Sequence, residues 1–169
     1  MNIRIEFTDP LTLHPERMRD AMMGAMHESV ALLEKEVRQR APVGVGGAAG
    51  LKGSIFGEVR EMTTKIHGLV GTPLAYAQAV EYGRGIGKRM PPVSALIPWV
   101  EQKLTINKGQ TAKGVAFAIA RYMAQRGSRS LRQSPPGERM FERGLAAAEP
   151  KILRIFERAF GTALRTVME

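Results

Sequence analysis

The chain has 169 residues, of which 44% are apolar and 24% are charged, values typical of one globular domain that exclude wholesale disorder and collagen-like repeats. The net charge is +9 and cysteine is absent, which excludes disulfide frameworks and thiolate sites. No apolar run approaches the length of a membrane span, and the first seven residues lack the apolar core of a signal peptide, so we expect a protein that is used without export.

The N-terminal third predicts a strand followed by a long helix. Ile3, Ile5 and Phe7 alternate with charged residues, which is the pattern of a half-buried strand. From Pro15 onward, apolar residues recur at three- and four-residue spacing, as in an amphipathic helix. We expect this helix to end near Arg40, because Pro42 cannot continue the hydrogen-bond ladder.

The middle of the chain predicts a glycine-rich loop, two strands and a short helix. Residues 43–50 are read as a flexible loop. Leu51 to Met62 and Thr64 to Gly71 look like strands that complete a small antiparallel sheet with the N-terminal strand. A short helix from Leu74 to Tyr82 should stop at the glycines that follow it.

The C-terminal half predicts three further helical segments. Val93 to Leu104 reads as a helix with Ser94 as its N-cap, and Pro98 is tolerable there only in the first turn. Thr111 to Arg126 reads as a second helix, and Trp99 and Tyr122 are interpreted as core residues rather than stacking platforms. Glu138 to Met168, interrupted by Pro150, is one kinked helix or two.

These elements indicate an α+β fold in which a small antiparallel sheet packs against the long N-terminal helix, with further helices in the C-terminal half. We expect one domain over residues 1–169, with flexible loops near residues 43–50, 83–91 and 127–137.

The excess positive charge is confined to the middle of the chain. Residues 82–139 hold 11 basic and 2 acidic side chains, whereas the remainder holds 14 of each. This distribution predicts one basic surface that faces a polyanion or an acidic protein, unless it is only a solvated face. The candidate interface or DNA-facing residues are Arg84, Lys88, Arg89, Arg126, Arg129 and Arg132.

No catalytic, cofactor or metal site is expected. The glycines of residues 44–50 follow a helix rather than a strand, and Gly87-Lys88 lacks the hydroxyl residue of a phosphate-binding loop. The three histidines lack metal-ligand spacing. Glu81 is therefore interpreted as structural: with Tyr82 and Gly83 it marks a sharp turn that an ion pair or backbone contact would fix. We predict a protein that is not an enzyme.

Three blocks of the sequence form a recognisable pattern when they are taken in order. The first is Ala41-Pro42 followed by a glycine loop and Leu51-Lys52-Gly53-Ser54-Ile55. The second and most distinctive runs from Val70-Gly71-Thr72 through Tyr76-Ala77-Gln78-Ala79-Val80-Glu81-Tyr82-Gly83. The third comprises Pro91-Pro92-Val93 with Leu96 and Trp99-Val100, and later Ile119-Ala120-Arg121, Arg126-Gly127-Ser128 and Met140-Phe141. Together these blocks resemble the neck and tail-completion proteins of long-tailed double-stranded DNA bacteriophages, with their proline-rich segment and helical tail, although Ala49-Gly50 stands where the family has Thr-Gly.

The resemblance implies a structural virion protein without catalysis. Such a subunit forms a homo-oligomeric ring, commonly a hexamer, at the head-tail junction, where it joins the head connector to the tail tube. It would be assembled in the cytoplasm of the bacterial host, contact the packaged duplex DNA non-specifically and have no membrane partner. The alternative from the residues themselves is a basic nucleic-acid-binding module, whose phosphate contacts should weaken with salt.

Overall fold

The computed structural model describes residues 1–8, 15–44, 50–63, 65–127 and 137–168. The chain divides into two compact units. Unit 1 comprises residues 1–40, 55–73 and 140–169, and unit 2 comprises residues 41–54 and 74–139. The architecture is mixed α+β, with a three-stranded antiparallel sheet, a long N-terminal helix packed against it and further helices toward the C-terminus, as the sequence predicted. The prediction of a single domain over residues 1–169 stays a prediction.

The sheet of unit 1 contains β1 (Asn2–Thr8), β2 (Phe56–Glu61) and β3 (Lys65–Gly71) in the order β1-β3-β2. Both pairings are antiparallel, with Val70 opposite Ile3 on one side and Gly57 on the other. Because side chains alternate along a strand, Val70, Ile66 and Gly68 of β3 share one face. All three are buried, and this is the face that α1 (Pro15–Arg40) covers.

Two glycines let α1 approach the sheet closely. A Cβ at Gly57 would lie 2.5 Å from Cγ1 of Val30, and a Cβ at Gly68 would lie 2.6 Å from Cγ2 of the same side chain. The helix face that meets the sheet is rich in methionine, with Met18, Met22 and Met26 buried. Flexible methionine side chains fill the irregular space between a helix and a twisted sheet.

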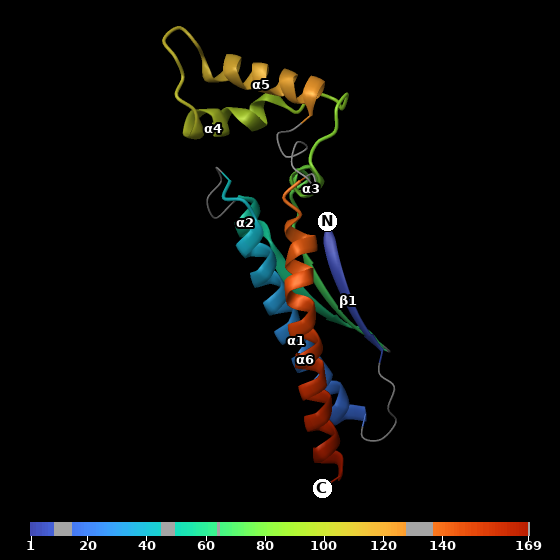
Figure 1. Cartoon of the computed structure of the whole chain (residues 1–169). Helices are drawn as coiled ribbons and strands as arrows, with labels where there is room; N and C mark the ends of the chain where they lie inside the picture. The colour runs from blue at the N-terminus through green and yellow to red at the C-terminus, as the bar shows by residue number, and fades with distance from the viewer. Residues whose placement is uncertain (9–14, 45–49, 64, 128–136, 169) are drawn as a thin grey trace. The chain divides into compact units, whose positions relative to one another are not determined.

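The other partner of α1 is α6 (Met140–Met168), which runs antiparallel beside it (Figure 1). At their close approach a Cβ on Gly144 would lie 2.6 Å from Cγ2 of Val37. Glu36 lies on α1, and its carboxylate accepts hydrogen bonds from Lys151 Nζ of α6 and from Arg40 Nη1 of α1, both at 2.6 Å. These bonds hold the pKa of the Glu36 carboxyl below its usual value of 4.5.

The part of unit 2 that the structure describes contains four helices: α2 (Leu51–Ser54), α3 (Ala77–Tyr82), α4 (Val93–Lys103) and α5 (Ala112–Arg126). The last two lie side by side (Figure 1). Thr111 caps α5, because its side-chain oxygen accepts a hydrogen bond of 3.1 Å from the Gly114 backbone N–H. Gly127 ends α5 with φ at 75°. The predicted boundaries of this helix are therefore confirmed to within one residue.

Residues 51–54 are helical rather than part of the predicted strand. The backbone N–H of Ser54 donates to the Gly50 carbonyl at 3.0 Å, and its hydroxyl donates to the Leu51 carbonyl at 2.9 Å. The strand prediction was wrong there because Leu51 and Ile55 fit one helical turn as well as a strand.

Two predictions about α4 were also wrong. Pro92 occupies the N-cap position, and Ser94 is already inside the helix. Pro98 is the sixth helical residue and lies beyond the first turn. It removes the N–H that would bond to the Ser94 carbonyl, and both residues are exposed, so that water can satisfy this carbonyl.

Residues around Pro150 belong to one helix. The sequence did not decide between one kinked helix and two helices. In the structure, α6 continues through Pro150 as one helix. Pro150 is exposed, which places the disrupted hydrogen bond where solvent can compensate for it.

Candidate functional site

The turn predicted at Glu81 is built from two segments of unit 2 that are distant in sequence. Ala77 and Glu81 lie one helical turn apart on α3 and are both buried, and Gly83 ends the helix with φ at 76°. The backbone N–H groups of Glu138 and Arg139 donate to the carbonyls of Val80 and Glu81 at 2.9 and 3.1 Å. The structural role of Glu81, Tyr82 and Gly83 stays a prediction, but the backbone contact that it needs is present.

Gly137 is the tightest point of this turn. Its φ is +83°, and a Cβ there would lie 1.9 Å from the Glu81 carbonyl oxygen. Arg139, two residues on, also adopts a positive φ of 51°. A non-glycine residue at 137 would therefore be unfavourable in both conformation and space.

The basic loop after α3 is held against the end of α5. The Gly87 N–H donates to the Ala124 carbonyl at 3.0 Å, and the Arg84 guanidinium donates to the Arg89 carbonyl. The first contact lies one residue from Lys88 and two residues from Arg126, so the structure brings these two predicted interface residues into one region. Lys88, Arg89 and Arg126 are exposed, and Arg84 is half-buried.

Arg129 and Arg132 lie outside the described residues, as do residues 45–49 and 128–136 of the predicted flexible loops. The flexibility predicted near residues 43–50, 83–91 and 127–137 stays a prediction.

Charge divides between the two units as unevenly as it does along the sequence. Unit 2 holds 12 basic and 3 acidic side chains, and unit 1 holds 13 of each. One of the three acidic residues, Glu81, is completely buried. Eight exposed cations of unit 2 form no ion pair with any described residue: Lys52, Lys88, Arg89, Lys103, Lys108, Lys113, Arg121 and Arg126.

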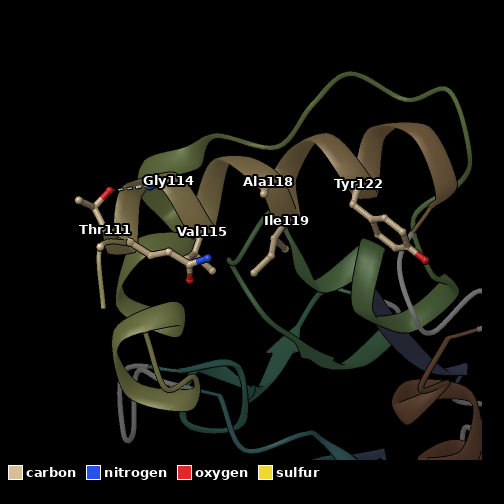
Figure 2. A pocket seen from close by; sticks show the side chains of 8 residues that line it. Thr111, Gly114, Val115, Ala118, Ile119 and Tyr122 are labelled. Carbon is tan, nitrogen blue, oxygen red and sulfur yellow. Dashed lines mark hydrogen bonds between the residues drawn. The ribbon is translucent and has the colours of Figure 1, made fainter. Parts of the chain in front are cut away.

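An apolar groove of about 600 Å³ runs along one face of α5. Its floor is formed by Val115, Ala118, Ile119 and Tyr122, with Gly114 and Thr111 toward the start of the helix (Figure 2). Gly114 has no side chain and Ala118 a small one, which leaves room for a neighbouring element. The larger side chains at 115, 119 and 122 offer that element apolar contact. The sequence interpretation missed this groove.

Unit 2 leaves most of its aromatic side chains in solvent. Trp99 and Tyr122 are 40% and 48% exposed, so the interpretation of these two residues as core was wrong. Phe117 is likewise 49% exposed. The buried residues of α5 are the small Ala116 and Ala120, which leaves the large apolar side chains of this helix without full cover.

The signal that locates the groove is present in the sequence but is ambiguous. Positions 115, 118, 119 and 122 have helical spacing and are apolar, and a stripe of this kind predicts only that something covers it. In most helices the cover comes from the same chain. Here the buried stripe is formed by Ala116 and Ala120 instead.

Across the described ranges, no group of three or more His, Asp or Glu side chains could hold a metal ion. No helix within these ranges combines the length and apolar character needed to cross a membrane. Comparisons of the chain with models of known protein families, with curated protein sequences and with solved structures find no match.

Proposed function

We propose that this chain is a ring-forming structural subunit of a tailed bacteriophage virion, a tail-completion or neck protein that joins the head connector to the tail tube and carries out no catalysis. The family resemblance of the sequence blocks supports the virion assignment. The open apolar groove of α5 is the observation that carries the assembly role, because a subunit that exposes such a surface gains stability when a partner covers it.

The most distinctive block of the resemblance has a structural reading that agrees with this role. In Tyr76 to Gly83, Ala77 and Glu81 are buried and Gly83 adopts a positive φ. These positions build a turn of unit 2. Motif positions of this kind preserve a shape, as an assembly subunit requires.

The occupant of the groove is a second copy of the chain, which contributes its unit 1. Unit 2 carries the whole net charge of +9 and unit 1 carries none. A contact between two copies of unit 2 would bring like charges together, whereas a contact between unit 2 and a neutral unit 1 avoids this repulsion. Different surfaces of the two copies then meet at each contact. Such heterologous contacts close into a ring when the rotation that relates neighbouring copies divides a full turn evenly.

The test places a charge in the groove. Ala118 is exposed, with room for a longer side chain, so Ala118→Glu leaves the free subunit folded. Within an assembled contact, an unpaired carboxylate would be buried, and we expect association to weaken by at least about 100-fold. Ala95→Glu is the matched control and should assemble normally, because Ala95 is exposed, belongs to unit 2 and does not line the groove.

Sedimentation velocity and negative-stain images of the two variants and the unchanged protein provide the measurement. Rings in the unchanged protein and in Ala95→Glu, but not in Ala118→Glu, support the proposal. Rings that Ala118→Glu forms as readily as the control would remove the groove from the subunit contact.

A second candidate, a nucleic-acid-binding module that does not assemble, is favoured by the unpaired cations of unit 2. The two functions differ in what remains when self-association is absent. A protein that stays monomeric at every concentration and binds nucleic acid in a salt-dependent manner would support the module instead of the ring.

A further inference from the structure

We propose that a second face of α5, together with the turn that precedes the helix, binds the phosphates of duplex DNA without reading sequence. The residues are Lys113, Phe117 and Arg121 on the helix and Lys103 and Lys108 before it. The relevance to a virion rests on the proposed function, but the binding itself is a property of the free subunit.

Lys113, Phe117 and Arg121 follow one another at four-residue intervals, so they lie along one face of α5. All three are exposed. The groove residues 115, 118, 119 and 122 have a different angular position on the same helix, and Figure 2 shows Val115 and Ile119 projecting together from the groove side. The cationic face and the apolar groove can therefore serve different partners.

The spacing of the two helical cations suits a phosphate backbone. Eight residues of α-helix separate Lys113 from Arg121, which is about 12 Å along the axis. Phosphates follow each strand with an axial step of about 3.4 Å, so both side chains reach different phosphates of one duplex segment. Lys103 ends α4 and Lys108 lies in the turn between the helices, which extends the cationic surface beyond the start of α5.

The charge of this surface is not neutralised within the described part of the chain. Lys103, Lys108, Lys113 and Arg121 form no ion pair with a described residue. Glu101 is the one acidic residue from Val93 to Arg126, and it is exposed in α4. Cations that lack internal partners are available to neutralise phosphates, and the release into solution of the counterions condensed on the DNA then drives binding.

Duplex DNA fits this surface better than single strands or a lipid surface. Single-strand binding depends on several aromatic platforms that stack successive bases, and Phe117 is the one aromatic residue between the two helical cations. Insertion into a bilayer requires a continuous, extensive apolar face opposite the charges. The groove side of α5, which lies opposite them, offers only the half-buried Val115 and Ile119 and the exposed Tyr122 as large apolar side chains.

The test uses fluorescence anisotropy with a labelled DNA duplex of random sequence and the full chain. Lys113→Gln with Arg121→Gln removes two cations from the helical face. Lys35→Gln with Arg154→Gln is the matched control, because both residues are exposed, belong to unit 1 and form no ion pair with described residues. Circular dichroism confirms that both double variants are folded.

We expect log affinity to fall linearly with log salt from about 50 to about 200 mM, and the slope to decrease by about 1.8 when the two contacts are lost. At 50 mM salt the affinity of Lys113→Gln/Arg121→Gln should fall by about one to two orders of magnitude. The control should lose less than about twofold. Lys113→Gln/Arg121→Gln leaves the groove side chains unchanged and should still form rings, which separates failure of this inference from failure of the ring contact.

Three results would overturn the inference. The first is an equal loss of affinity in the two double variants. The second is that a single strand binds more tightly than the duplex and that Phe117→Ala abolishes this single-strand binding. The third is that the protein binds phosphatidylglycerol vesicles through Lys113 and Arg121 but does not bind the duplex.

Discussion

Replacement of Gly137 by alanine perturbs the turn of unit 2 at its tightest point. The new Cβ would lie 1.9 Å from the Glu81 carbonyl oxygen, and the positive φ of 83° is unfavourable for alanine. The conformational cost is about 1–2 kcal/mol. Relief of the overlap requires a shift that weakens the two backbone hydrogen bonds of Glu138 and Arg139, each with a net contribution of about 0.5–1.5 kcal/mol. We therefore expect a loss of about 2–5 kcal/mol.

Gly109 provides the matched control, because its φ is +90° and a Cβ there would meet nothing within 4 Å. Gly109→Ala should lose only the conformational term of about 1–2 kcal/mol. Urea unfolding followed by the fluorescence of Trp99 measures both variants in unit 2, since Trp99 is the single tryptophan of the chain. An equal loss of unfolding free energy in the two variants would refute the close approach of residues 81 and 137.

The remaining predictions concern unit 1. Gly144→Ala places a Cβ 2.6 Å from Cγ2 of Val37 and should destabilise the contact of α1 with α6 by about 1–3 kcal/mol. Gly161→Ala, in the same helix, meets nothing within 4 Å and should stabilise the helix by about 0.5–1 kcal/mol. Thermal unfolding followed by circular dichroism measures both changes. Because the folded-state pKa of Glu36 is lowered, this carboxylate contributes stability above pH 4.5 that is lost as the pH falls through the folded-state pKa. Lys151→Met should reduce this pH dependence in denaturant titrations, and an unchanged dependence would contradict the assigned cause.

Long periodic elements of unit 1 could be predicted from the sequence. The apolar stripe of α1 and the alternation of β1 record which side is buried, and the structure confirms both elements. Periodicity of this kind is a local property that needs no knowledge of the partner surface.

Short elements and long-range contacts could not be predicted in the same way. Four residues, Leu51 to Ser54, are too few to separate a helix from a strand. The hydrogen bonds that join Val80 and Glu81 to Glu138 and Arg139 connect segments far apart in the chain. The sequence marks Glu81 as a turn residue, but it does not indicate what the turn packs against.

The candidate surface was only partly predictable, for a related reason. The sequence localised the positive charge correctly, and the structure assigns all of the excess to unit 2. Trp99 and Tyr122 were misassigned because an apolar residue at helical spacing is equally consistent with cover from its own chain and cover from a neighbour. In any subunit that assembles with neighbours, amphipathic patterning alone does not distinguish these two kinds of burial.

The most direct test of the proposed ring is native mass spectrometry of the purified protein at high concentration, combined with class averages of the same particles. We expect one closed species with a fixed number of copies, six being the number that the family resemblance implies, and cyclic symmetry without a twofold axis between neighbours. A monomer at every concentration, or a dimer related by a twofold axis through two copies of unit 2, would contradict the proposal.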